Sequence, residues 1–253
     1  MTTLTVTHAV PPLAARPFAS RVRAVVRLIL IDRYSFLWIP IIIASSAFVL
    51  TLAIWLIVLK ASNGQASNAS SGVYLGGAQA AFWYLLAMSI QTVNRAFPLS
   101  MGLSVSRREF HAGFSVVLVL ISLAVATSYT AFSLIEQATN GWGIGMLFFN
   151  TLGVRPWYET FLVYFALIFF LMTVPSIFAA VYMRWKNVGV LVAFAILAIL
   201  LVGSIALITS ANAWPAIGAW FVAQGATGVA AWSLVPSVLA IGGLSLVLRR
   251  ATP

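Results

Sequence analysis

Long runs of apolar residues dominate the chain, and short polar or charged stretches separate them. A helix needs roughly 20 apolar residues to cross a bilayer core of about 30 Å, because its backbone must satisfy its own hydrogen bonds there. Six runs reach that length, and we expect each to be a transmembrane helix: 36–59, 73–96, 113–135, 158–182, 188–209 and 228–248. The pattern therefore predicts an all-α membrane protein with a six-helix transmembrane domain over residues 35–250.

The basic residues lie mostly on one side of these six spans. Twelve of the fourteen Lys and Arg residues fall on the side that holds both termini, and only Lys60 and Arg155 fall on the other. Cytoplasmic loops keep the excess of Lys and Arg, so both termini are expected in the cytoplasm and the loop 61–72 outside. Twelve Arg against two Lys, in an Ala- and Val-rich chain, favour a bacterial source and hence the bacterial cytoplasmic membrane.

The N-terminal region divides into a tail and a basic helix. Residues 1–15 hold Pro11 and Pro12 and no secretory signal pattern, so a flexible cytoplasmic tail is expected there. Over residues 16–34, helical spacing places an apolar stripe opposite a basic one that includes Arg16, Arg23 and Arg27. Such an amphipathic "elbow" helix lies in the membrane interface among anionic headgroups. The alternative is the positive-inside flank of the first span.

Two shorter apolar pieces, 141–154 and 210–227, lie outside between spans. The second is interrupted by Pro215, Gly218 and Gly225, which makes it a poor single span. We expect both to be re-entrant segments, because irregular backbone is tolerated at membrane depth where protein buries it. The alternative is interfacial packing by tryptophans as aromatic belts.

Several classes of function are disfavoured by what the sequence does not contain. A net charge of +10 would favour nucleic-acid binding, but the arginines are scattered between apolar runs and form no patch. No nucleic-acid partner is therefore expected. No predicted span holds an ionisable residue near its middle, which disfavours a proton- or sodium-coupled carrier. With no Cys, two His and no GxxxxGK[ST] loop, we expect no catalytic, cofactor-binding or metal-binding residue in this chain, which is therefore not an enzyme.

The joint between the second and third spans gathers an unusual share of the charges. It reads MGLSVSRREFHAGF over residues 101–114, and Pro98 and Gly102 are expected to break the preceding helix. Ser106 and Glu109 have the S-x-x-E spacing of a capping box, which predicts that a new helix begins near Arg107. We expect a short, rigid cytoplasmic knuckle. The alternative is an ordinary turn that obeys the positive-inside rule.

These features in this order resemble the permease subunits of ABC-2-type ABC transporters. The basic elbow helix, six spans, arginine-bearing knuckle and re-entrant pieces carry the resemblance, together with GLSVSRREFHAG, which looks like a coupling segment. The resemblance implies a second permease copy, identical or homologous, and two copies of an ABC ATPase subunit that bind ATP and Mg. It places ATPase coupling at Ser104, Ser106, Arg107, Arg108, Glu109 and Phe110. Charge pairing by Arg107, Arg108 and Glu109, with Phe110 as an apolar anchor, is our hypothesis within it.

A polar stripe on the second span is a candidate lining of the transport pathway. Its members recur at helical spacing: Tyr84, Met88, Gln91 and Arg95. Ordinary helix packing, with Arg95 reaching the headgroups, is the alternative. The leading interpretation is an exporter of an amphipathic or hydrophobic drug, lipid or peptide. The alternatives are a nonenzymatic scaffold or sensor that docks a cytoplasmic partner, and an ATP-independent carrier or channel.

Overall fold

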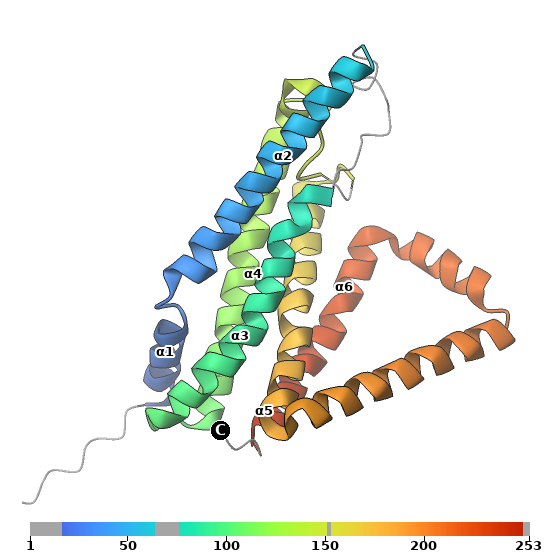
Figure 1. Cartoon of the computed structure of the whole chain (residues 1–253). Helices are drawn as coiled ribbons and strands as arrows, with labels where there is room; N and C mark the ends of the chain where they lie inside the picture. The colour runs from blue at the N-terminus through green and yellow to red at the C-terminus, as the bar shows by residue number, and fades with distance from the viewer. Residues whose placement is uncertain (1–16, 64–75, 151–152, 250–253) are drawn as a thin grey trace, which may run out of the picture.

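The computed structural model describes residues 17–63, 76–150 and 153–249, and most of these residues are helical, with no strand among them (Figure 1). The predicted tail 1–15, Arg16 and most of the loop 61–72 lie outside the described residues. The elements in chain order are α1 (Phe18–Ile29), the π-helical turn η1 (Tyr34–Trp38), α2 (Ile39–Ala61), the 3₁₀ turn η3 (Gly76–Gln79), α3 (Ala80–Gly102), α4 (Arg107–Ala138), the π-helical turn η4 (Gly141–Gly145), α5 (Trp157–Ser210) and α6 (Trp214–Arg249).

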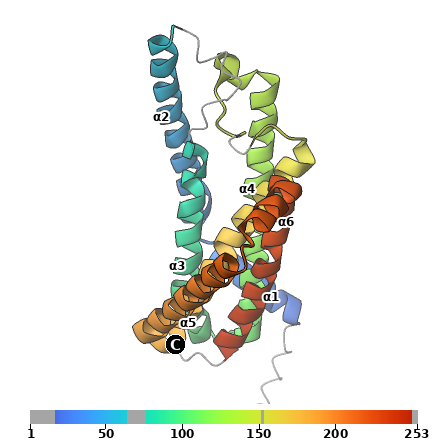
Figure 2. The ribbon, with the colours of Figure 1, turned by 90° about the vertical axis from the view of Figure 1, so that its right-hand side faces the viewer.

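The core of the bundle lies where α3, α4 and the first part of α5 pack together (Figures 1 and 2). Large apolar side chains from all three helices fill it, among them Phe82, Leu118 and Met172, each almost fully buried. The last part of α6 packs on α5, and α2 packs on α3. The described chain begins at α1 and ends in α6 at the same end of the bundle (Figure 1). We call this end, where α3 also meets α4, the α1 end.

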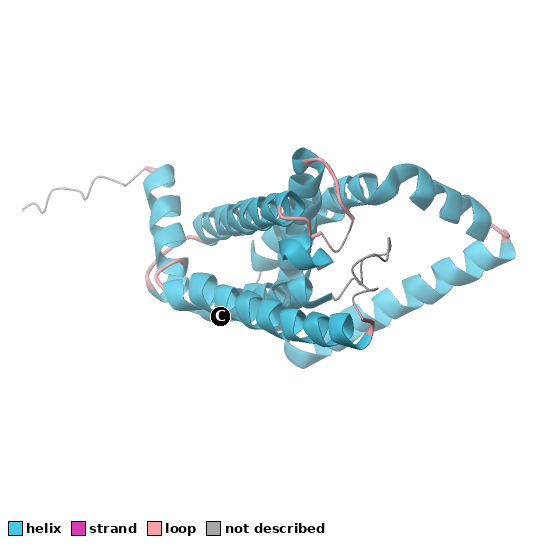
Figure 3. Ribbon diagram, turned by 90° about the horizontal axis from the view of Figure 1, so that it is seen from above, coloured by secondary structure: helices cyan, strands magenta, loops and turns pink. Residues whose placement is uncertain are grey.

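Two single-residue bends divide α5 and α6. Lys186 (φ 56°, ψ −148°) interrupts α5, and Gly225 (φ 60°, ψ −176°) interrupts α6. Glycine adopts this backbone region without steric strain, whereas in lysine the β-carbon makes it strained. Residues 187–224 between the two bends project away from the bundle as a helical arm (Figures 1 and 3).

The arm shows that the predicted re-entrant segment 210–227 is mostly helical and not irregular, while its re-entry into the membrane stays a prediction. A turn at 211–213 joins two helices, and α6 begins at Trp214. Pro215 does not break that helix because it lies in the first turn, where a missing N–H costs nothing. Only Gly225, of the three predicted breakers, interrupts the helix, and Gly218 lies within it.

Among the described residues, four helices are long and apolar enough to cross a membrane: Tyr34–Ala61, Arg107–Ala138, Trp157–Ser210 and Trp214–Leu248. The described part of the chain therefore has the helical, apolar character of a membrane protein, as predicted. Two of the expected spans, 158–182 and 188–209, lie within the single element α5 on either side of Lys186. The count of six spans stays a prediction.

Candidate functional site at the α1 and α4 corner

The predicted capping box is confirmed at the first turn of α4. The Ser106 hydroxyl accepts a hydrogen bond from the Glu109 backbone N–H (3.3 Å), and the Glu109 carboxylate accepts one from the Ser106 backbone N–H (2.9 Å). Each side chain satisfies a backbone donor that the helix start leaves without a partner. Helix α4 therefore begins at Arg107, as the spacing predicted.

The turn before this cap is tight. Helix α3 runs through Pro98 and ends at Gly102, so the expected break at Pro98 was wrong. Ser104 then adopts a left-handed conformation (φ 60°), and backbone hydrogen bonds from Ser104 to Met101 and from Val105 to Ser100 close the turn. Only four residues separate α3 from α4, which makes the connection short, as expected of the knuckle.

Helix α1 is fastened to the start of α4 by one ion pair and one close packing contact. The Arg21 guanidinium donates to the Glu109 carboxylate at 3.3 Å, and Glu109 is almost fully buried. One turn further along, Gly113 lies against Val25, so closely that a β-carbon on Gly113 would lie 2.6 Å from a methyl carbon of Val25. The elbow helix and the knuckle thus form one packed unit, which we call the corner.

The candidate coupling residues divide into buried and outward-facing sets. Phe110 is fully buried, with its ring 5.2 Å from that of Phe97 and stacked on Phe114, so it is a core residue and not the exposed anchor that we hypothesised. The Glu109 carboxylate bonds to Ser106 and Arg21 within the chain, so it does not face outward to pair with a partner protein. The physical reason is that Glu109 and Phe110 face α1 and α3 on the inner side of α4.

The coupling residues that face outward are the two arginines of the knuckle and the two serines of the turn beside it. Arg108 is exposed, and its guanidinium lies 5.4 Å from the ring centre of Phe18 in α1. Arg107 is partly exposed, and Ser104 and Ser106 are exposed in the turn beside it. In the elbow helix Arg23 and Arg27 are also exposed. The α1 end of the bundle therefore presents a basic surface around the knuckle.

A bulky residue at position 113 should separate α1 from α4. In Gly113→Leu the new side chain has no room beside Val25, and overpacking of this kind costs about 1–3 kcal/mol. The chain has no cysteine, so a single reporter cysteine at the buried position Ile29 is expected to resist maleimide in the parent and to react in the Gly113→Leu background.

The matched control for this substitution is Gly102→Leu. A β-carbon on Gly102, at the end of α3, would meet no atom within 4 Å, so labelling of the reporter at position 29 should stay slow. Equal protection of the reporter in the Gly113→Leu and Gly102→Leu proteins would show that the close contact does not hold α1 in place.

The predicted pathway stripe on α3 faces the link between α1 and α2. The Tyr84 hydroxyl donates to the backbone carbonyl of Ser35 (2.9 Å), and Met88 is buried beside it. Gln91 and Arg95 are exposed, and with Met88 they line a small cavity of about 140 Å³ that also includes Asp32. The stripe therefore holds the first helices together at Tyr84, while its role in transport stays a prediction.

Asp32 stabilises the link between α1 and α2. Its carboxylate accepts hydrogen bonds from the Ser35 hydroxyl (2.6 Å) and the Ser35 backbone N–H (3.1 Å), just before η1 begins. These two bonds hold the pKa of Asp32 below its ordinary value; desolvation opposes them, and the positive charge of Arg95 adds a smaller lowering effect. The ionised carboxylate thereby stabilises the change of direction from α1 into α2.

Sequence reasoning missed the role of Glu136 at the far end of α4. This residue is fully buried, and its two carboxylate oxygens accept five hydrogen bonds of 2.8–3.0 Å. The donors are the Trp142 indole, the Asn150 side chain and three successive backbone N–H groups: Phe148, Phe149 and Asn150. A feature of the sequence could have indicated this role: an acidic residue at the end of a predicted span, followed by the glycine-rich stretch GWGIG, whose backbone needs a hydrogen-bond partner to hold one conformation.

This network folds back most of the predicted re-entrant piece 141–154. Four consecutive residues from Asn140 to Gly143 have positive φ, which turns the chain sharply after α4. The returning segment then packs along the bundle, with Phe149 stacked on Phe132 of α4 and the Trp55 indole of α2 donating to the Ile144 carbonyl. Met146 and the segment Phe148 to Asn150 are thus buried by protein, which is the condition that re-entry requires, whereas Gly143 and Val154 are exposed.

Comparison with protein-family models, with curated proteins and with solved structures finds no match to this chain. Its functional interpretation therefore depends on the geometry of the corner and on the charges that the corner presents.

Proposed function

We propose that the chain is the membrane-spanning permease subunit of an ATP-driven exporter, and that its corner receives a separate ATPase subunit. In this proposal two permease copies form the pathway, two ATPases bind ATP and Mg, and the α1 end faces the cytoplasm of a bacterial cell. The cargo would be amphipathic or hydrophobic, since the chain is rich in apolar and aromatic residues and poor in charge.

The observation that supports this proposal most directly is the way in which the corner connects to the rest of the bundle. The first turns of α4 contact α1 through the Arg21–Glu109 pair, α3 through the Phe97–Phe110 pair and α6 through His111, whose ring nitrogen lies 2.9 Å from the Ile241 carbonyl. A push on the knuckle would therefore move three helices together. This is what a coupling element must do, because close-packed interiors transmit displacement and do not absorb it.

The charge on the corner indicates the kind of partner that would bind it. Arg108 is exposed and Arg107 is partly exposed beside a tight turn, and the exposed Arg23 of α1 adds a further positive charge. A soluble protein with an acidic groove would complement this surface, and electrostatic complementarity of that kind sets orientation and speeds association. ATP-driven closure of two such partners would push both knuckles and tilt the helices attached to them.

The decisive experiment is recovery of the partner from native membranes in a mild detergent. We expect a phosphate-loop ATPase in equal stoichiometry with this chain, and an intact-complex mass that corresponds to two copies of each. Recovery of a different cytoplasmic protein at that stoichiometry would support a scaffold or sensor instead. Absence of any ATPase under several detergents would contradict the exporter proposal.

A further inference from the structure

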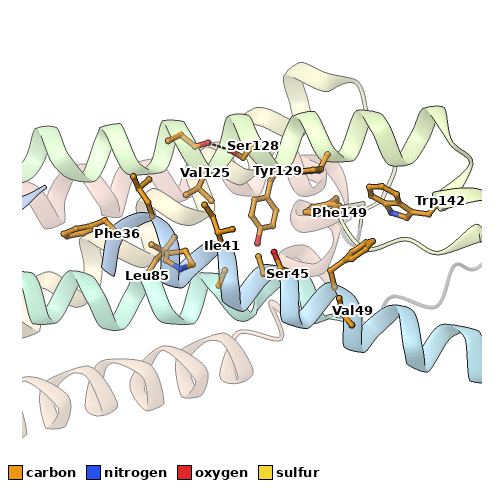
Figure 4. A pocket seen from close by; sticks show the side chains of 17 residues that line it. Phe36, Ile41, Ser45, Val49, Leu85, Val125, Ser128, Tyr129, Trp142 and Phe149 are labelled. Atoms are coloured by element: carbon orange, nitrogen blue, oxygen red, sulfur yellow. Dashed lines mark hydrogen bonds between the residues drawn. The ribbon is translucent and has the colours of Figure 1, made fainter. Parts of the chain in front are cut away.

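A continuous apolar groove runs along α4 on the side that faces α2. One cavity of about 480 Å³ lies between α2, α3 and α4, and Figure 4 shows its lining from Phe36 at one end to Trp142 at the other. A second cavity of about 730 Å³ lies between α1, η1 and α4. The two cavities share four lining residues, which makes them one groove: Phe36, Leu37, Ala124 and Val125.

The groove exists because α2 and α4 do not pack on each other. Helix α2 packs on α3 and η3, whereas α4 packs mainly on α1, α5 and α6. Small side chains line the facing positions, with Ala44 and Ser45 on α2 opposite Ala124 and Ser128 on α4. Small residues usually let two membrane helices approach closely. Here the helices stay apart, and the small residues widen the space between them.

The lining suits hydrocarbon. The Tyr129 hydroxyl donates to the Ala78 carbonyl (2.9 Å), and the Ser128 hydroxyl donates to the Ala124 carbonyl (2.9 Å), so neither hydroxyl needs a partner from within the groove. Along α4 the lining extends from Leu120 to Phe132, which is about 18 Å at roughly 1.5 Å per helical residue. That length and polarity accommodate much of a fatty acyl chain.

One end of the groove is basic. Arg27 and Arg33 line the cavity at the α1 end, and neither has an acidic side chain within ion-pair distance among the described residues. Within the described ranges, no aspartate or glutamate lines either cavity. Asp32, next in sequence to Arg33, lines the separate small cavity with Arg95 and is bonded to Ser35. By contrast, Arg21 on the same helix is already paired with Glu109.

We infer that this groove is a binding site for one anionic phospholipid of the leaflet that contacts α1. The acyl chain would lie between α2 and α4, and the phosphate would lie between Arg27 and Arg33. Basic pockets between membrane helices near the interface select anionic headgroups in this way. Several lining side chains are exposed along the groove, among them Leu37, Ile41 and Leu120, so a lipid could enter it from the bilayer. The inference does not depend on the proposed ATPase and goes beyond the general attraction of an amphipathic helix to headgroups.

The test uses the full chain in nanodiscs made from a mixture of phosphatidylcholine and phosphatidylglycerol, followed by native mass spectrometry of the lipid that stays bound. We expect one retained phosphatidylglycerol per chain, enriched over its share of the bilayer. In Arg27→Gln/Arg33→Gln the preference should fall roughly 30-fold, because each arginine near the surface strengthens attraction to anionic lipid about fivefold.

The matched control is Arg23→Gln/Arg184→Gln. Arg23 lies in α1 and Arg184 lies in α5 beside the bend at Lys186, and neither lines either cavity. The control therefore removes the same charge and should keep the preference of the parent protein. Equal loss in both double variants would overturn the site, since it would show a general effect of charge. Equal retention of both lipids by the parent chain would overturn the headgroup selectivity and leave an apolar groove.

A second variant tests the acyl-chain part of the groove without touching the arginines. Ala124 is exposed and lines both cavities, so Ala124→Trp fills the groove at its middle without entering the core. We expect this variant to retain little lipid of either kind while keeping the thermal stability of the parent chain. Undiminished retention of phosphatidylglycerol would overturn the placement of the acyl chain between α2 and α4.

Discussion

Replacement of both Arg107 and Arg108 with glutamate is expected to abolish transport-linked ATP hydrolysis and recovery of the ATPase partner. If the corner binds an acidic groove, the double reversal replaces attraction with like-charge repulsion. Juxtaposed like charges cost several kcal/mol, and a loss of about 3 kcal/mol already weakens binding roughly 100-fold. The measurement is ATP hydrolysis by the co-purified complex in proteoliposomes, with and without cargo.

The control for this variant must separate coupling from insertion, since arginines near a span also set its orientation. Arg184→Glu/Lys186→Glu makes the same change in charge on α5, at two residues that belong neither to the corner nor to its basic surface. A single cysteine at Ser62, beyond α2, reports orientation through a membrane-impermeant maleimide, because the chain has no other cysteine. Normal coupling in the correctly inserted Arg107→Glu/Arg108→Glu protein would contradict the proposed docking surface.

Glu136→Ala is expected to be the most destabilising single substitution at the other end of the bundle. It leaves five N–H donors without an acceptor in a fully buried site. Each buried donor left unpaired costs about 1–3 kcal/mol, and partial relaxation of the loop reduces the sum. We expect a loss of roughly 4 kcal/mol, which corresponds to a fall in Tm of about 10 °C for a chain of this size.

Two comparisons make the Glu136 prediction specific. Glu159→Ala removes a partly exposed carboxylate that accepts a hydrogen bond from the Thr227 hydroxyl at 2.7 Å, and should cost below about 1 kcal/mol. A reporter cysteine at the buried Met146 should react with maleimide only when the loop after α4 is released. A Glu136→Ala protein no less stable than Glu159→Ala, with Met146→Cys still protected, would show that the network does not hold the loop.

The features that could be predicted from the sequence are those with a local cause. The apolar runs have the length and period of membrane helices, so the helical class of the chain followed from them. The S-x-x-E spacing located the start of α4 at Arg107, because a capping box joins residues only three positions apart. The amphipathic stripe likewise anticipated α1 at Phe18–Ile29.

The errors at the candidate site have a common origin. Phe110 was expected to face a partner, yet it packs on Phe97 of α3; Glu109 was expected to pair outward, yet it pairs with Arg21 of α1. Both contacts join residues that are distant in the sequence. Nothing in the local pattern around the knuckle shows which face of α4 the neighbouring helices cover.

The sequence by itself determined that this chain is helical, apolar and basic at one set of helix ends, because period, length and charge are properties of short segments. Only the tertiary structure decided that Glu136 holds the loop after α4, that Lys186 and Gly225 set the arm apart, and that α2 and α4 leave a groove between them. Each of these depends on the position of one helix relative to another. That position is set by packing over the whole bundle, where small residues permit close approach but do not dictate it.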